Sequence, residues 1–318
     1  MITRHEVAVF GLLALIGSTM SAAAQERNKA RQPVEPQPLP WDFRDFADPE
    51  KFLPSFFGPD SAAERQALER VEISPSDERT YGNRAAQAFL SELRRHGIQI
   101  TSRGRDVEYL RRLVAVVQTR MKNRARYPAW QIHIAEADPT EAKCFPGGTL
   151  VFFRGLLDDA RSEATLVAVI AHELSHVDHG HQLNLLRRMK LAEQTFANPG
   201  AGGPRSFLQN GPLLMRAFTH PFRPEDETEA DRDATQWSYE LGYDPREFAE
   251  LFQRLQQRAP VTVNLPAFLR THPPHADRHR AILATFEELQ RKSPVAELYV
   301  GRENLRRRLP REQQAFEE

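Results

Sequence analysis

The segment Val169-Ile170-Ala171-His172-Glu173-Leu174-Ser175-His176-Val177 combines a strongly apolar run with two histidines spaced four residues apart. On a helix this spacing puts both imidazoles on one face, one turn apart, where they can bind the same metal ion. Glu173 borders that site and is positioned to take a proton from a metal-bound water molecule. Because apolar residues precede the motif, the sequence predicts a buried helix over residues 162–178 that carries a buried polar cluster.

A catalytic zinc site has three protein ligands and leaves one position for water. Gln182 stands where a metzincin carries its third histidine, which excludes that class. The acidic run at residues 225–231 offers carboxylates instead, and Glu227 and Asp231 share one helical face because they are four residues apart. One of them can bind the metal while the other hydrogen-bonds a ligating histidine. We expect the neighbouring polar residues to be loop or surface groups: Glu225, Glu229, His179 and His181.

Four elements follow one another between about residues 80 and 290. They are Pro146-Gly147-Gly148 with Gly155-Leu156-Leu157 behind it, the His172–His176 motif followed by His181, Glu227-Thr228-Glu229-Ala230-Asp231, and Thr271-His272-Pro273 with Arg278. Together they resemble the M48 metallopeptidases, a family of periplasmic quality-control proteases, mitochondrial Oma1-like proteases and membrane-embedded enzymes. The chain departs from the family at Glu141-Ala142-Lys143-Cys144, where many members carry Asn-Ala-Phe followed by Ala or Cys.

The resemblance implies an α+β, zincin-like metalloprotease domain, mostly helical, with a small mixed sheet and an active-site helix carrying the HExxH motif. It implies one zinc ion per chain. The implied ligands are His172, His176 and Glu227. Asp231 would not bind the metal itself but would hydrogen-bond one of its ligands. Glu173 would act as the general base. The resemblance places His272 over the metal, where it stabilises the oxyanion or caps the metal in a resting state, and Arg278 would orient the same loop.

Residues 149–153 form a short apolar run after the Pro-Gly-Gly turn and predict a strand. We expect this to be the open edge strand beside the metal. Its residues are Thr149, Leu150, Val151, Phe152 and Phe153. Substrate backbone would then pair with it as one more strand, a mode that suits unfolded or extended chains.

The amino-terminal residues predict a targeting signal and not a part of the folded domain. Residues 1–24 combine a charged start, a short apolar run and small residues before Gln25, as in a signal peptide. We therefore expect export, to the periplasm in a Gram-negative cell or into the medium. The apolar run is too short to span a bilayer, and no other segment is apolar enough, so no transmembrane segment is expected after cleavage.

The remainder of the chain divides into three expected parts. Residues 25–78 are rich in proline and aromatics and predict an arm that packs along the domain, with a lid or a partner-docking segment as alternatives. Residues 79–292 are the expected metallopeptidase domain, and residues 293–318 a charged, solvated tail. Within the domain, the glycines and prolines of residues 198–221 predict a loop without regular structure that is a candidate lid.

Composition excludes several classes. Lys and Arg number 43, as do Asp and Glu, so the formal net charge of zero does not favour a nucleic-acid binder. A single cysteine, Cys144, excludes an internal disulfide framework. The sequence therefore predicts an exported zinc endopeptidase, and its substrates, unfolded or misassembled envelope proteins, are implied by the resemblance alone. A latent protease, a zinc-bound chaperone or adaptor with a capped site, and a non-peptide hydrolase remain as alternatives.

Overall fold

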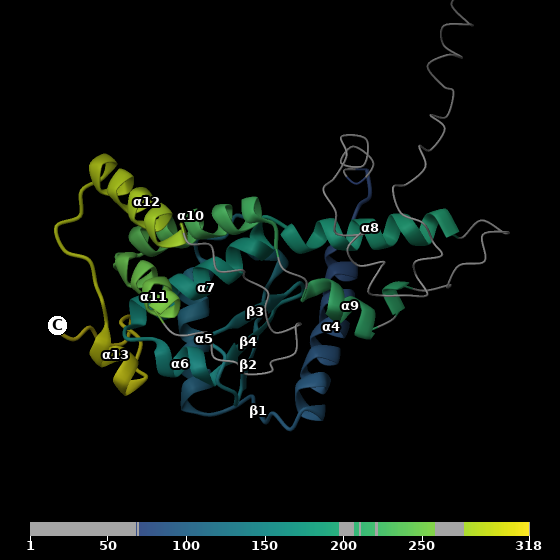
Figure 1. Cartoon of the computed structure of the whole chain (residues 1–318), viewed down its shortest axis with the longest axis horizontal. Helices are drawn as coiled ribbons and strands as arrows, with labels where there is room; N and C mark the ends of the chain where they lie inside the picture. Colours follow the sequence, from purple (N-terminus) through teal and green to yellow (C-terminus); the bar gives the residue numbers. More distant parts are fainter. Residues whose placement is uncertain are drawn as a thin grey trace, which may run out of the picture. The chain divides into compact units, whose positions relative to one another are not determined.

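The computed structural model describes residues 68, 70–196, 207–209, 211–219, 222–257 and 277–317. The predicted signal peptide, His272, and the predicted arm except for residues 68 and 70–78 lie outside these residues. Figure 1 shows a mainly helical domain around one small sheet. In the described part of the chain, no helix has the length and apolar character needed to cross a membrane.

The sheet has four strands: β1 (Ile100–Thr101), β2 (Gln131–Ala135), β3 (Ala142–Phe145) and β4 (Thr149–Phe153). Their order in space is β1-β2-β4-β3, with β2 and β4 parallel and the other two pairs antiparallel. The Pro146-Gly147-Gly148 turn joins β3 to β4, and both of its glycines have a positive φ that other residues rarely adopt. A small mixed sheet among dominant helices confirms the predicted α+β class.

The prediction that Thr149–Phe153 is the open edge strand is wrong. Strand β4 lies between β2 and β3, and all five of its residues are buried. A continuous apolar run without polar alternation is typical of an interior strand, because both faces must be buried. The edge nearest the histidine helix is β3 instead, formed by the segment where the sequence departs from the family pattern.

Two helical layers cover the two faces of the sheet. On one face, Phe89 of α4 (Pro75–Arg95) contacts the rings of Phe145 and Phe153. On the other face, the alternate residues Cys144 and Phe152 join the main core with α5 (Arg105–Gln118) and α7 (Glu163–Asp178). Figure 1 shows the sheet between α4 and the α5–α7 pair.

Helix α7 occupies the centre of the domain, and every one of its residues is buried. It begins after Ser162, whose hydroxyl oxygen accepts the backbone N–H of Thr165. This N-cap satisfies one of the backbone donors that a helix start leaves without an internal partner. At the other end, the Asp178 carboxylate accepts the backbone N–H groups of Lys122 and Asn123, at 2.9 and 2.7 Å. The predicted buried helix at residues 162–178 is confirmed.

The remaining helices follow in sequence. They are α6 (Arg154–Asp159), α8 (His181–Phe196), α9 (Gly211–Phe218), α10 (Pro224–Glu240), α11 (Arg246–Gln257), α12 (Arg278–Lys292) and α13 (Arg302–Arg307), with 3-10 turns η2 (Arg124–Arg126) and η3 (Phe207–Gln209). Helix α10 packs along α7 and against α12, so the acidic run lies beside the histidine motif. Helices η3 and α9 fall within residues 198–221, so that segment is not the structureless loop that its glycines and prolines suggest.

The segment after residue 292 is not a solvated tail. Tyr299 bridges to Tyr243, Asn304 in α13 is fully buried, and the backbone N–H of Arg311 donates to Glu163 at 3.0 Å. Many residues of this segment are charged, but a few buried residues among them hold the segment against the start of α7. Charge content alone therefore does not identify a solvated segment.

Candidate metal centre

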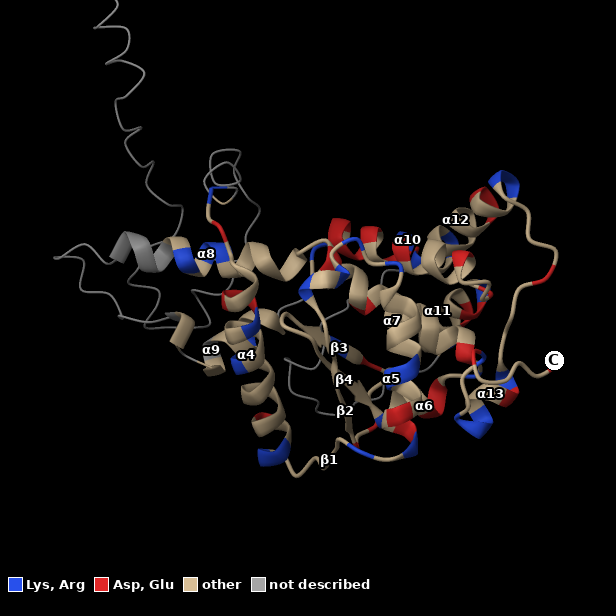
Figure 2. Cartoon of the chain, turned by 180° about the vertical axis from the view of Figure 1, so that it is seen from behind, with Lys and Arg blue, Asp and Glu red and all other residues tan. Residues whose placement is uncertain are grey.

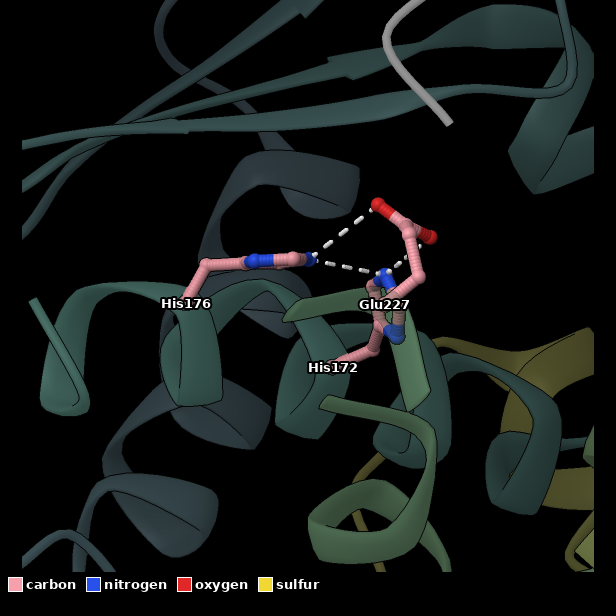
Figure 3. Close-up of side chains that lie close together, drawn as sticks. All are labelled: His172, His176 and Glu227. Carbon is pink, nitrogen blue, oxygen red and sulfur yellow. Dashed lines mark hydrogen bonds and ion pairs between the residues drawn. The ribbon is translucent and has the colours of Figure 1, made fainter. Parts of the chain in front are cut away.

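Helices α7 and α10 bring two histidines and one carboxylate together. The Nε2 atoms of His172 and His176 are 3.2 Å apart, and each lies 3.6 Å from a carboxylate oxygen of Glu227. Figure 3 shows the two rings and the carboxylate pointing toward one another. The three side chains are at most 5% exposed, so they form a buried, convergent donor set.

The spacing of these atoms suits a tetrahedral ion. Ligand atoms each about 2.0–2.1 Å from zinc are roughly 3.3 Å from one another in that geometry. The two Nε2 atoms are 3.2 Å apart, and the distances of 3.6 Å from His172 Nε2 to Glu227 Oε2 and from His176 Nε2 to Glu227 Oε1 are also close to this value. Two imidazole nitrogens and one carboxylate also match the ligand chemistry of catalytic zinc. The residues therefore fit the implied metal.

Glu173 lies on α7 directly after His172 and is buried. Its Oε2 atom accepts the backbone N–H of Cys144, in the edge strand β3, at 2.9 Å. The Phe153 N–H donates to the Glu141 C=O at 3.0 Å. In this register the backbone N–H and C=O groups of Glu141, Lys143 and Phe145 point toward β4. The backbone groups of Cys144 therefore face the outer edge of the sheet, and Glu173 is held at that edge.

Charged side chains that pair with one another lie on the Nδ1 side of His172. Its Nδ1 atom is 3.0 Å from Asp231 Oδ1, and Arg278 of α12 donates to both oxygens of Asp231, at 2.7 and 2.6 Å. The Arg278 guanidinium also lies 3.2 Å from Glu227 and stacks on the Phe252 ring at 4.0 Å. The sequence brings Arg278 to this cluster from a distant helix, beside both carboxylates.

These contacts change the proton affinity of the cluster. Burial raises the pKa of Asp231, but the bonds from His172 and Arg278 outweigh burial and hold that pKa below its usual range. Burial lowers the pKa of Arg278, yet its bonds to Asp231 leave that pKa raised. Asp231 is therefore a charged acceptor, which fixes His172 with Nδ1 protonated and Nε2 turned toward Glu227.

A different arrangement lies behind His176. Its Nδ1 atom is 2.9 Å from Nδ1 of His181, and Nε2 of His181 is 3.1 Å from Glu229 Oε2. Phe222 stacks on the His176 ring at 3.8 Å with an angle of 13°. The His181 side chain is only 6% exposed, so the expectation of a surface histidine is wrong. The sequence contained an indication that His181 lies near the site. His181 follows the ligand His176 by only five residues, and its partner Glu229 follows the ligand Glu227 by only two.

Strand β3 adds two buried groups that the sequence did not single out as part of the site. Lys143 is 3% exposed, and burial lowers its pKa to about 8 despite the carboxylates of Glu141, Glu173 and Glu227. Burial also raises the pKa of the Cys144 thiol well above its usual value. Cys144 is therefore a protonated core residue, as expected.

The geometry assembles most of the predicted site. His172, His176, Glu227, Asp231 and Arg278 form one cluster, and Glu173 borders it on the same helix. His272 lies outside the described residues, so its predicted place over the metal stays a prediction.

Sequence comparisons agree with this arrangement. The chain is similar to the mitochondrial metalloendopeptidase OMA1 of Schizosaccharomyces pombe, with 28% identity over 175 residues that cover 54% of this chain and 50% of the relative. It is also similar to the beta-barrel assembly-enhancing proteases of Yersinia pestis (28% identity, 48% of this chain, 33% of the relative) and Escherichia coli K12 (29% identity, 43% and 30%). The chain thus spans half or less of the length of these relatives.

The family comparison covers more than half of the chain. The family model described as Peptidase family M48 matches residues 105–285. This range runs from the start of α5 into α12 and contains the histidine motif, the acidic helix α10 and Arg278. The chain is therefore a member of peptidase family M48.

Proposed function

We propose that this protein is a zinc-dependent endopeptidase that cleaves unfolded or extended polypeptides. The observation that carries the proposal is the convergence of His172, His176 and Glu227 at tetrahedral spacing, with Glu173 beside them. Membership of a peptidase family and relatives named metalloendopeptidase and protease support the same activity. The zinc ligands would be those three side chains.

Zinc bound by these residues would activate a water molecule and polarise the scissile carbonyl. Glu173 would take a proton from the attacking water and deliver it to the leaving nitrogen. The bond from the Cys144 N–H holds this carboxylate at the edge of the sheet, where the substrate backbone would lie. Asp231, paired with Arg278, would keep His172 in the tautomer that presents Nε2.

Strand β3 is the proposed platform for substrate. An extended chain that pairs with an exposed edge gains main-chain hydrogen bonds that depend little on its side chains. The backbone groups of Cys144 face this edge, where its N–H donates to Glu173 and its C=O accepts from Gln182, so a substrate strand would displace Gln182 to reach the carbonyl. Folded substrates offer few strands for such pairing, which favours unfolded or misassembled chains.

The parts of the chain that lie wholly or mostly outside the described residues enter as proposals. Residues 1–24 would direct export, and residues 25–78 would form an arm on the peptidase domain or dock a partner. His272 would stabilise the oxyanion or cap the metal in a resting state. An exported quality-control protease of envelope proteins accommodates all three assignments.

The test is the digestion of casein, an unstructured protein, by the full-length chain and by Glu173→Gln. We expect cleavage by the wild type and a rate lower by about 10²–10⁴ in the variant, the usual contribution of a general base. Glu288→Gln, a change at an exposed α12 carboxylate, is the control and should cleave normally. Each sample is checked for bound zinc by elemental analysis.

Two outcomes would contradict parts of the proposal. Equal cleavage by wild type and Glu173→Gln would exclude Glu173 as the base. An absence of cleavage by every sample with zinc bound would favour a latent protease or a zinc-bound adaptor. In that case substitution of His272 separates the two, because only a latent protease would be released by it.

A further inference from the structure

A second cluster of metal-binding side chains lies where α7 ends and α8 begins. Its members are His179, His181 and Glu229, whose donor atoms lie within 4.8 Å of one another. Gly180, with φ of +69°, lies between the two histidines at the junction of the helices, and the two rings stack at an angle of 14°. Glu229 Oε2 lies 3.3 Å from His179 Nδ1 and 3.1 Å from His181 Nε2. Both separations are close to the roughly 3.3 Å between ligand atoms of tetrahedral zinc.

One histidine of this cluster is already oriented for metal binding. His179 Nε2 is 2.7 Å from Oδ2 of Asp233, and the same oxygen accepts the Ser175 hydroxyl at 2.9 Å. A carboxylate only accepts hydrogen bonds, so the proton of neutral His179 is on Nε2 and the lone pair of Nδ1 faces Glu229. A carboxylate behind a histidine is the usual support of a metal ligand.

The cluster repeats the layout of the first site, displaced by two residues along α10. There Glu227 faces two histidines and Asp231 supports His172, whereas here Glu229 faces two histidines and Asp233 supports His179. Figure 2 shows that acidic residues colour much of α10 red. One of them, Asp226, has a carboxylate oxygen 3.8 Å from His181 Nε2. This excess of negative charge favours a cation.

We propose that His179, His181 and Glu229 form a second divalent-cation site at the rim of the first. Two imidazole nitrogens and one carboxylate oxygen select zinc or a similar transition-metal ion over calcium or magnesium. The site is more exposed than the first, since the side chains of His179 and Glu229 are 23% and 36% accessible. Binding there is therefore expected to be weaker and reversible.

The two sites share a hydrogen bond that makes them antagonistic, a step that rests on the proposed first site. His176 turns Nε2 toward His172 and Glu227, so its proton is on Nδ1 and faces Nδ1 of His181. His181 then accepts this bond and carries its own proton on Nε2. A cation on His181 Nε2 displaces that proton to Nδ1, where two N–H groups would face each other across 2.9 Å. Filling the second site should therefore weaken the first.

The test is a Co²⁺ titration of the metal-free full-length chain, followed by calorimetry and visible absorption. We expect two equivalents for the wild type and one for His179→Ala. His96→Ala is the matched control and should keep two equivalents, because His96 pairs with Glu92 at 3.5 Å but belongs to no three-donor group among the described residues. Glu229→Gln keeps the size of the side chain and should also lose one equivalent.

The competition gives a second measurement. Because coupling between two sites is reciprocal, a filled first site should weaken the second. The second site should therefore bind Co²⁺ more weakly in the wild type than in His172→Ala, which has lost a ligand of the first site. The loss of a supporting partner typically weakens a metal ligand about 10–100-fold, which sets the expected ratio of the two affinities.

The outcomes separate this proposal from the proposed function. One equivalent in both the wild type and His179→Ala would overturn the second site and leave the protease proposal standing. Two equivalents without proteolysis would support the second site and count against the protease. Equal Co²⁺ affinities of the second site in the wild type and His172→Ala would overturn the coupling between the sites.

Discussion

Two buried cations near the first site are treated differently by the fold. Arg278 of α12 and Lys143 of β3 are 5% and 3% exposed, and the charges of Glu141 and Glu227 act on both. Arg278 donates to both oxygens of Asp231. Within the described ranges, Lys143 Nζ has no hydrogen-bond partner.

The pKa values record this difference. That of Arg278 is raised above its ordinary value, whereas that of Lys143 is lowered to about 8. Nearby negative charge therefore does not compensate burial unless an acceptor lies at hydrogen-bond distance. A planar guanidinium can meet a carboxylate with two parallel bonds, which a single ammonium cannot do. The contrast predicts opposite effects when each cation is removed.

The largest effect is expected for Arg278→Leu. The change leaves Asp231 and Glu227 buried without their cation, and breaking a buried pair from one side costs about 3–5 kcal/mol of unfolding free energy. Urea unfolding followed by circular dichroism measures the loss. A matched control is Arg306→Leu, since Arg306 also bonds both oxygens of a carboxylate, Glu303, but the two side chains are 70% and 27% exposed. The control should lose little stability, because an exposed ion pair contributes little, and equal losses would refute the role of burial.

A smaller effect of opposite sign is expected for Lys143→Met. The folded pKa of about 8 lies below the ordinary value of 10.5, so the unfolded chain binds more protons between these two pH values. Stability of the wild type should therefore rise with pH across this window. Below pH 8 the full penalty is present, and 2.5 pKa units correspond to about 3 kcal/mol. Lys143→Met should be more stable by up to this amount at pH 7.

The pH dependence supplies the check on that prediction. The advantage of Lys143→Met should shrink between pH 8 and pH 10.5, as the wild-type lysine loses its proton in both states. Lys292→Met removes an exposed lysine that pairs with Glu288 and should show no such dependence. A constant advantage from pH 7 to pH 10 would mean that packing, and not charge, separates the two proteins.

The sequence predicted one side of the site better than the other. The spacing of His172 and His176, and of Glu227 and Asp231, is local, because each pair lies on one helix with a fixed repeat. The family resemblance supplied Arg278. Strand order is set by non-local pairing, so the edge position of β3 did not follow from its own residues. Lys143 in a four-residue strand resembles a surface residue, but it is buried on the face of the sheet that α4 covers, with Nζ 5.9 Å from the centre of the Phe89 ring.

The smallest expected effect on stability concerns the two backbone groups of Cys144 that point away from β4. One is bonded to a charged carboxylate and the other to a neutral amide. Its N–H donates to Glu173, whereas its C=O accepts from Gln182 Nε2 at 2.6 Å. Gln182→Ala should lower the unfolding free energy by about 1 kcal/mol, the net value of one hydrogen bond. Gln118→Ala removes a similar amide bond, to Tyr127 C=O at 2.7 Å, and is the control for stability.

Activity distinguishes the two glutamine variants. If substrate pairs with β3, it must displace Gln182 to reach the Cys144 carbonyl. Gln182→Ala should then raise kcat/KM for an unfolded substrate by a factor of about 2–10, equivalent to one net hydrogen bond, while Gln118→Ala leaves it unchanged. A fall in kcat/KM for Gln182→Ala alone would mean that Gln182 supports the substrate strand instead of occupying its position. The neutral contact of Cys144 with Gln182 would then belong to the active site, as does its charged contact with Glu173.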